Sequence, residues 1–138
     1  MRVVIDTNVL VSALRSARGA SFRLVQLLGS GRFEPVISPP LCLEYEDVLR
    51  RRDVLPGYTD RDISDFLDYF LSECVECRIH FLWRPYLPDP KDDLVLELAL
   101  AGAARFIITH NLRHFEGADA LKIAAVTPAA FLDMIGKT

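Results

Sequence analysis

The sequence predicts an α/β fold, a three-layer α/β/α sandwich with a central parallel sheet. Short apolar segments, such as residues 2–5 at the start of the chain, alternate with segments of helical periodicity. The apolar segments are continuous rather than alternating with polar residues. This indicates strands buried on both faces, as in a parallel sheet that helices cover on each side.

The length of 138 residues favours one domain over residues 1–138. Hydrophobic residues make up 51% and charged residues 25%, the balance of an ordered globular protein. No apolar stretch reaches the roughly 18 residues of a membrane span, and no cleavable leader is visible, so we expect a soluble, cytoplasmic protein. An odd set of three cysteines also favours a reducing compartment over a disulfide framework.

The first half of the chain contains two predicted strands and four predicted helices. Gly29 and Gly31 end the second helix, and Ser38 followed by two prolines is typical of a helix start. The expected order is a strand at 2–5, a helix through Leu14, a helix at 21–28, a strand at 33–38, a helix from Leu41 to the arginines at 50–52, and an amphipathic helix from about 59 to 74.

The second half contains three predicted strands and two predicted helices. A proline-rich loop at 83–93 separates the first of these strands from the next helix, and Pro128 begins the closing helix. The expected order is a weak strand at 75–79, a helix at 94–103 opened by Asp92 or Asp93, a strand at 105–109, a turn, a strand at 121–127, and a final helix.

Acidic side chains stand where several of these elements meet. Asp6 directly follows the first strand, Glu44 lies in the helix after the second strand, and Asp92 and Asp93 precede the strand at 105–109. Right-handed crossovers bring these positions to one edge of the sheet if the first strand is central. Ligands of open α/β sheets bind beyond the carboxyl ends of the strands, so this edge is the predicted site.

Each acid also has a purely structural interpretation. Asp6 fits the cap of the following helix, and Glu44 fits a solvated face beside Glu46 and Asp47. Asp92 and Asp93 fit first-turn acids that complement a helix dipole. Convergence on one edge favours the site, because independent caps and surface acids need not meet. Grouped carboxylates repel one another unless a cation offsets their charge, and Mg²⁺ or Mn²⁺ is the usual remedy.

Three ordered motifs resemble the PIN domain, in the branch close to the toxin ribonucleases of toxin–antitoxin pairs. They are "VVIDTNVLVSAL" at the start, "ISPPLCLEYEDVL" in the second helical unit, and "DPKDDLVLELALAGAARFIITHNLRHF" near the end. The resemblance covers nearly the whole chain. It implies a Mg²⁺- or Mn²⁺-dependent endoribonuclease that hydrolyses single-stranded RNA.

The resemblance also implies which residues form the site. Asp6, Glu44 and Asp93 are the catalytic, metal-binding acids, and counting back from Thr109 favours Asp93 over Asp92. Many PIN domains carry a fourth acid that this chain replaces with Asn111. A related pattern has an acid where this chain has His114, so Asp92 or Asp89 becomes a candidate for the missing charge.

Other residues complete the expected site. Asn8, Thr109 and Asn111 support the carboxylates or position substrate. An acidic pocket repels RNA, so a basic rim is needed, and Trp83 and Tyr86 are candidates for stacking on a base. The candidates for phosphate contacts are Arg15, Arg18, Arg50, Arg51 and Arg52, each equally compatible with a solvated surface charge.

Alternative interpretations remain open at this point. A catalytically weakened PIN-like module would bind RNA or protein without cleaving it. A phosphotransferase would form an aspartyl phosphate on Asp6, but such enzymes place a second Asp where Asn8 stands. His110 and His114 have the spacing of a metal-binding pair, yet they fall on a predicted turn. The toxin resemblance further implies a small antitoxin partner and a homodimer.

Overall fold

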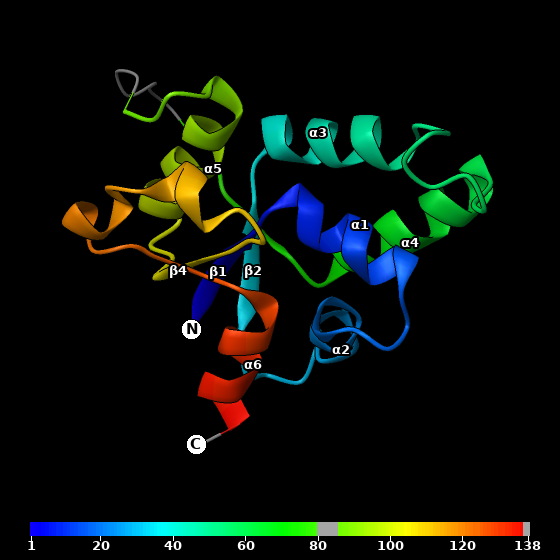
Figure 1. Ribbon diagram of the computed structural model, residues 1–138, viewed down its shortest axis with the longest axis horizontal. Helices are drawn as coiled ribbons and strands as arrows, with labels where there is room; N and C mark the ends of the chain where they lie inside the picture. Colours follow the sequence, from blue (N-terminus) through cyan, green and yellow to red (C-terminus); the bar gives the residue numbers. More distant parts are fainter. Residues whose placement is uncertain (80–85, 137–138) are drawn as a thin grey trace.

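The computed structural model describes residues 1–79 and 86–136 and contains a five-stranded sheet in the order β3-β2-β1-β4-β5 (Figure 1). Every pair of neighbouring strands is parallel, which confirms the predicted sheet, and β1 is central, which meets the condition for bringing the acids to one edge. The strands are β1 (Arg2–Ile5), β2 (Glu34–Ile37), β3 (Val75–Glu76), β4 (Phe106–Ile108) and β5 (Ala124–Val126).

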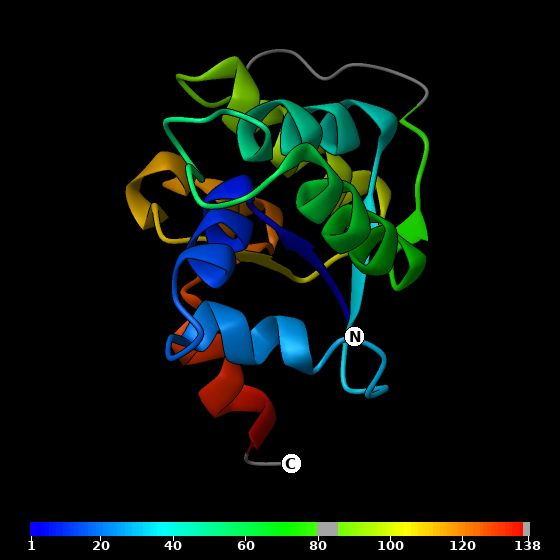
Figure 2. The ribbon, with the colours of Figure 1, turned by 90° about the vertical axis from the view of Figure 1, so that its right-hand side faces the viewer.

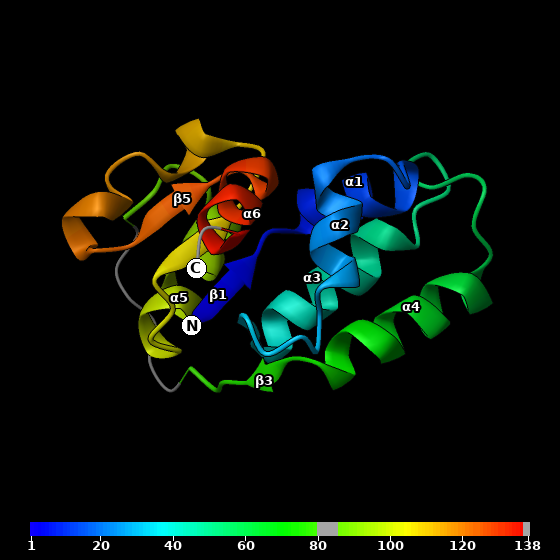
Figure 3. The ribbon, with the colours of Figure 1, turned by 90° about the horizontal axis from the view of Figure 1, so that it is seen from below.

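Helices cover both faces of this sheet, as predicted. Figure 2 shows α3, α4 and α5 above the strands, with α2 and α6 below them. The view in Figure 3 places β5 and β3 on opposite sides of β1. The helices are α1 (Thr7–Arg15), α2 (Ala20–Gln26), α3 (Pro39–Leu49), α4 (Asp60–Ser72), α5 (Pro90–Ala101) and α6 (Pro128–Gly136), with short 3₁₀ helices η1 (Leu112–Phe115) and η2 (Ala118–Leu121). Within the described ranges, no helix combines the length and hydropathy that a bilayer crossing requires.

Local caps explain where the helices that carry acids begin. The Ser38 hydroxyl accepts a bond from the Leu41 amide at 3.3 Å, so α3 starts at the two prolines as predicted. Helix α5 starts earlier than the expected Asp92 or Asp93. Its cap is Asp89, whose carboxylate accepts from the Lys91 amide at 2.9 Å, and Pro90 occupies the first helical position. Asp92 and Asp93 therefore lie inside the first turn.

Two predicted strands are shorter in the structure than in the sequence analysis. The strand expected at 75–79 keeps two residues, paired with the end of β2. The strand expected at 121–127 begins only at Ala124, because residues 118–121 form η2 and Lys122 adopts a left-handed conformation with φ 63°. Neither change moves an acid.

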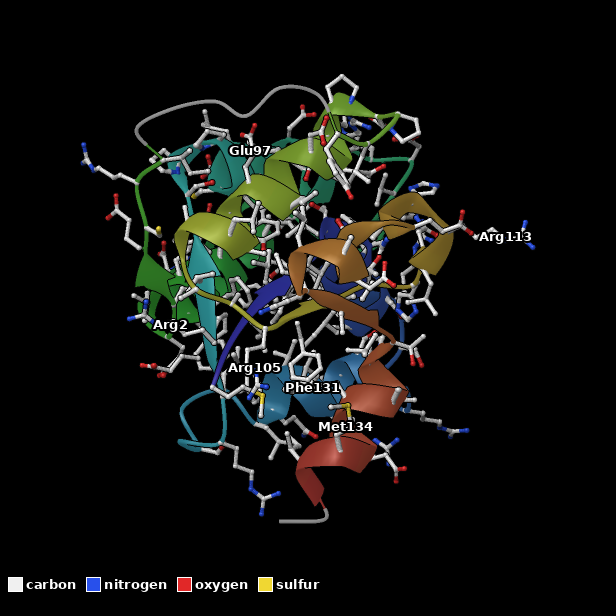
Figure 4. All side chains as sticks on the ribbon, turned by 90° about the vertical axis from the view of Figure 1, so that its left-hand side faces the viewer. Arg2, Glu97, Arg105, Arg113, Phe131 and Met134 are labelled. Atoms are coloured by element: carbon white, nitrogen blue, oxygen red, sulfur yellow. The ribbon has the colours of Figure 1, made fainter. Side chains whose placement is uncertain are left out.

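The core lies on both sides of β1. Val3, Val4 and Ile5 are completely buried, which explains why this strand is uniformly apolar. Below the sheet, the Phe131 ring on α6 makes edge contacts with Phe33 and Phe106, at centroid distances of 5.4 and 5.9 Å (Figure 4). This packing holds α6 against β4 and the start of β2.

Above the sheet, Tyr45 ties α3 to the last residue of β1. Its ring is completely buried and lies edge-on to Phe70 of α4, at a centroid distance of 5.6 Å. Its hydroxyl donates a hydrogen bond to the carbonyl oxygen of Ile5. Since Ile5 precedes Asp6 and Tyr45 follows Glu44, this bond holds the backbones of the two acids together.

We predict that Tyr45→Phe lowers the free energy of unfolding by about 1–3 kcal/mol, because a buried carbonyl oxygen loses its hydroxyl donor while the ring packing is kept. Urea denaturation of the unmodified protein and of Tyr45→Phe measures this difference in the free energy of unfolding. Tyr69→Phe is the matched control, since Tyr69 is 43% exposed and its hydroxyl lies 3.5 Å from its acceptor. Equal losses for the two variants would contradict this role for the Tyr45 hydroxyl.

Candidate functional site

Asp6 is a buried carboxylate at the carboxyl end of the central strand. Its residue is only 8% exposed. Oδ1 accepts a hydrogen bond from the Thr7 amide at 2.9 Å, so Asp6 does cap α1, as its structural interpretation proposed. Oδ2 accepts from the Thr109 hydroxyl at 2.8 Å and from the Asn8 side-chain amide at 3.2 Å. Capping therefore engages one oxygen, and the other faces the end of β4.

Asn8 and Thr109 join the start of α1 to the end of β4. The side-chain oxygen of Asn8 (Oδ1) accepts from the His110 backbone amide at 3.1 Å. Its side-chain nitrogen (Nδ2) lies 3.4 Å from the Thr109 hydroxyl. The same hydroxyl accepts from the Asn111 amide at 3.0 Å. The predicted supporting residues thus form one hydrogen-bonded group around Asp6, with Asn111 joined through its backbone.

Glu44 faces α1. Its Oε2 accepts a hydrogen bond from the Thr7 hydroxyl at 2.7 Å, and the residue is half-buried. Glu46 and Asp47, by contrast, form i,i+4 ion pairs with Arg50 and Arg51. The solvated-face interpretation therefore fits Glu46 and Asp47 but not Glu44.

Asp92 is the α5 acid that the structure brings to this group. Its side chain is 13% exposed, and its Oδ2 lies 3.3 Å from Nδ1 of His114. Burial raises the pKa of Asp92. The contact with His114 opposes that rise, and the negative charges of Asp89 and Glu44 add to it. His114 thus partners an acid in this structure.

Asp93 is bound to the loop that precedes α5. Its Oδ1 accepts hydrogen bonds from the amides of Leu87 at 2.8 Å and Tyr86 at 3.2 Å, and its Oδ2 lies 3.3 Å from the latter. The PIN resemblance, with counting back from Thr109, favours Asp93 over Asp92 as the third metal-binding acid, and this assignment stays a prediction. In the structure Asp93 anchors the loop, and Asp92 shares the electrostatic environment of Asp6 and Glu44.

The electrostatics of Asp6 show how strongly the acids interact. Its pKa is raised to about 6, chiefly by burial, while the hydrogen bonds from Thr109 and Thr7 lower it. The negative charges of Glu44 and Asp92 raise it further. The charges of Glu44 on α3 and Asp92 on α5 therefore disfavour the ionised form of Asp6, and a cation among the three acids would reverse this effect.

The donor set fits a hard divalent ion that keeps most of its water. Carboxylate oxygens suit Mg²⁺ and Mn²⁺, and Mg²⁺ commonly binds one or two carboxylates with several waters. Within residues 1–79 and 86–136, no three Asp, Glu, His or Cys side chains stand close enough to form a preassembled cluster. Water-bridged coordination therefore fits this arrangement better than direct coordination by every acid.

The two histidines of the turn have separate partners. His110 Nε2 lies 3.0 Å from the hydroxyl of Ser21 on α2, whereas His114 contacts Asp92. The spacing that suggested a paired metal site thus serves two different contacts. All three cysteines are free thiols, and burial raises the pKa of Cys74 to about 12. Such a thiol is a poor metal ligand at neutral pH.

Most of the predicted phosphate-binding arginines bind the protein itself. Arg15 donates twice to the Val54 carbonyl oxygen, at 2.8 and 3.1 Å. Arg50 donates to the Ser64 hydroxyl and the Asp60 carbonyl oxygen, and Arg51 pairs with Asp47 at 2.6 Å. Arg18 and Arg52 are exposed. Trp83 lies outside the described residues.

Sequence reasoning missed two residues at the site. The hydroxyl of Thr7 binds Glu44, although its place directly after Asp6 was a signal that it would lie among the acids. Arg113 extends into solvent from η1, next to His114, and Figure 4 shows it pointing away from the molecule.

Tyr86, a predicted base-stacking residue, is half-exposed. Its hydroxyl donates to the Gly117 carbonyl oxygen at 2.8 Å, which anchors the ring beside the turn that carries His114.

Comparisons with known proteins agree with this fold. The family model described as "PIN domain" matches residues 2–113. The crystal structure of VapBC2 from Rickettsia felis, bound to a DNA fragment from their promoter, superposes with a TM-score of 0.62 at 17% sequence identity. The match covers 92% of this chain and 98% of the other, and at this identity it supports the fold alone. The curated proteins contain no significant match.

We predict that, in EDTA, Asp6→Asn changes the free energy of unfolding more favourably at pH 8 than at pH 4. The difference between the two pH values is about 1–2 kcal/mol. The folded-state pKa of Asp6 is raised from 3.8 to about 6, so the folded protein holds this proton more tightly than the unfolded chain. The contribution of Asp6 to stability is therefore highest below pH 4 and falls as the pH rises from about 4 to about 6. Asparagine removes that loss.

Thermal unfolding from pH 4 to pH 8 measures this difference. Asp65→Asn, on the exposed face of α4, is the matched control and should leave the pH profile unchanged. An Asp6→Asn profile parallel to that of the unmodified protein would show that the Asp6 carboxylate is not destabilised by its surroundings.

Proposed function

The chain belongs to the PIN domain family, whose members are generally nucleases, and on that premise we propose that it is a metal-dependent endoribonuclease acting on single-stranded RNA. One observation carries the proposal. Asp6, Glu44 and Asp92 come from three separate elements, and their charges act on one another at the carboxyl edge of the sheet. A fold that needed only caps and surface charge would gain nothing from this arrangement.

The three acids have distinct roles in this proposal. Asp6 and Asp92 would hold Mg²⁺ or Mn²⁺, directly or through water, and Glu44 would orient the attacking water. A bound ion of this kind supplies a water of lowered pKa and neutralises charge on the leaving oxygen. Asp6 is held by Thr7, Asn8 and Thr109, so its position is set before the substrate arrives. Asn111 adds no negative charge.

Contacts with RNA would come from exposed cations whose side chains bind no partner among residues 1–79 and 86–136. Arg113, beside His114, and the exposed Arg18 are the candidates that we propose, because the guanidinium groups of Arg15, Arg50 and Arg51 have protein partners. A guanidinium group binds phosphate through two parallel hydrogen bonds.

A small antitoxin is the protein partner that we propose, together with a homodimer. The support is the fold shared with the VapBC2 complex and the acidic edge itself. A basic side chain from an antitoxin would offset the same charges that a divalent ion offsets. The three free thiols support the proposal of a cytoplasmic location.

A catalytically weakened binding module is the second candidate. Asn111 replaces the fourth acid of many relatives, and the acids of the described residues form no preassembled cluster. The aspartyl-phosphate alternative is less favoured, since Asn8 stands where such enzymes place a second Asp and donates its side-chain amide to Asp6. Cleavage assays distinguish the nuclease from the binding module.

We predict that the protein cleaves a 5′-labelled single-stranded RNA only when Mn²⁺ or Mg²⁺ is present. Asp6→Asn should reduce the rate by more than about 100-fold, because it removes the most buried charge of the site. Asp65→Asn should cleave at the unmodified rate. Cleavage that survives in Asp6→Asn, or that proceeds in EDTA, would refute the assignment, and binding without cleavage by the unmodified protein would favour the second candidate.

The neighbouring acids of α5 allow a matched comparison. We predict that Asp92→Asn weakens Mn²⁺ binding by about 10-fold or more, since it removes a carboxylate that acts on Asp6 and Glu44. Asp93→Asn should keep the Mn²⁺ affinity and lose about 1–2 kcal/mol of stability through weaker bonds to the loop amides. Titration calorimetry and urea denaturation measure the two effects. The reverse pattern would make Asp93 the third acid.

A further inference from the structure

Thr7 donates hydrogen bonds to two of the three acids. Its amide donates to Oδ1 of Asp6 at 2.9 Å, and its hydroxyl donates to Oε2 of Glu44 at 2.7 Å. The residue is 6% exposed and occupies the first position of α1, where its amide has no partner within the helix. One residue therefore spans the space between an acid that follows β1 and an acid of α3.

The direction of both bonds is fixed. A hydroxyl carries a single proton, so the bond to Glu44 commits it, and carboxylates accept bonds but do not donate them when ionised. The cap at Asp6 sets the backbone of Thr7, and a β-branched side chain has few rotamers. The hydroxyl is thus presented to α3 by the same geometry that begins α1.

This bond opposes a repulsive force. Asp6, Glu44 and Asp92 are all acids, and each of the latter two disfavours ionisation of Asp6. A glutamate has three side-chain torsions and would move toward solvent if nothing held it. The bond from Thr7 engages Oε2, which leaves Oε1 as the oxygen that can face an ion or its bound water.

We propose that Thr7 is a positioning residue, which holds the Glu44 carboxylate beside Asp6 so that the two acids act on the same divalent ion. The inference rests on the proposed function, because it assigns a role within that metal site. It makes the hydroxyl, rather than the shape of the side chain, the feature that the site requires.

Three substitutions separate the hydroxyl from the shape. Thr7→Val keeps the volume and branching and removes the donor, whereas Thr7→Ser keeps the donor and removes a methyl group. Both retain the backbone amide that binds Asp6. If Thr7→Val does not fold, Thr7→Ala removes the same donor. Thr127→Val is the matched control, because the Thr127 hydroxyl also sits at a helix start but bonds a backbone amide, that of Ala130 in α6, and not a carboxylate.

Titration calorimetry of the full chain with Mn²⁺ is the test. We expect Thr7→Val to weaken binding by about 10-fold or more, the usual effect of losing a group that orients a metal ligand. Thr7→Ser and Thr127→Val should bind as the unmodified protein does. In a Glu44→Ala background, Thr7→Val should cause no further loss, because its effect passes through Glu44.

The outcomes are distinct. If the unmodified protein does not bind Mn²⁺, the proposed function fails and this inference fails with it. If the unmodified protein binds Mn²⁺ and Thr7→Val binds equally well, only this inference is overturned. Equal losses in Thr7→Val and Thr7→Ser, or a further loss in the Glu44→Ala background, would show that Thr7 acts through packing and would also overturn it.

Discussion

The burial of one carboxylate at the end of the central strand is the constraint on which this site depends. Asp6 is held by the Thr7 amide, the Asn8 side-chain amide and the Thr109 hydroxyl directly after β4, and these three donors make its burial tolerable. They do not abolish its cost, since the pKa of Asp6 still stands at about 6. A carboxyl group that is buried despite this unfavourable free energy is typical of a functional site.

The topology of the sheet brings other acidic segments to the end of β1, where Asp6 lies. Because β1 is central, the chain returns beside it twice, through β2 and α3 on one side and through α5 and β4 on the other. Parallel strands place their carboxyl ends together. The same edge of the sheet therefore carries the residues after β1 and β4 and the nearby turns of α3 and α5. Tyr45 binds the end of β1 from one face of the sheet, and Phe131 packs against the other face.

The sequence was sufficient for the parallel sheet and, on the condition that the first strand is central, for the edge at which acids gather, because these follow from apolar periodicity and crossover handedness. It was insufficient wherever a local contact decided the outcome. The cap at Asp89 starts α5 one turn early, and the loop amides bind Asp93 while His114 contacts Asp92, pairings that residue counting does not predict. The arginines after α3 looked free in the sequence, yet Arg50 and Arg51 have acceptors on α3 and α4. Thr7 appeared as an ordinary first helical residue, since its partner lies 37 positions away.

The central claim is that carboxylates from separate elements act on one divalent ion at this edge. The most direct measurement is a crystal structure of the protein soaked in Mn²⁺, with the ion located by its anomalous scattering. The account predicts a peak at the carboxyl end of β1, within about 2.5 Å of an oxygen of Asp6 or Asp92 or joined to both through ordered water. An ordered, well-diffracting crystal with no peak there, and with Glu44 turned away from Asp6, would contradict it.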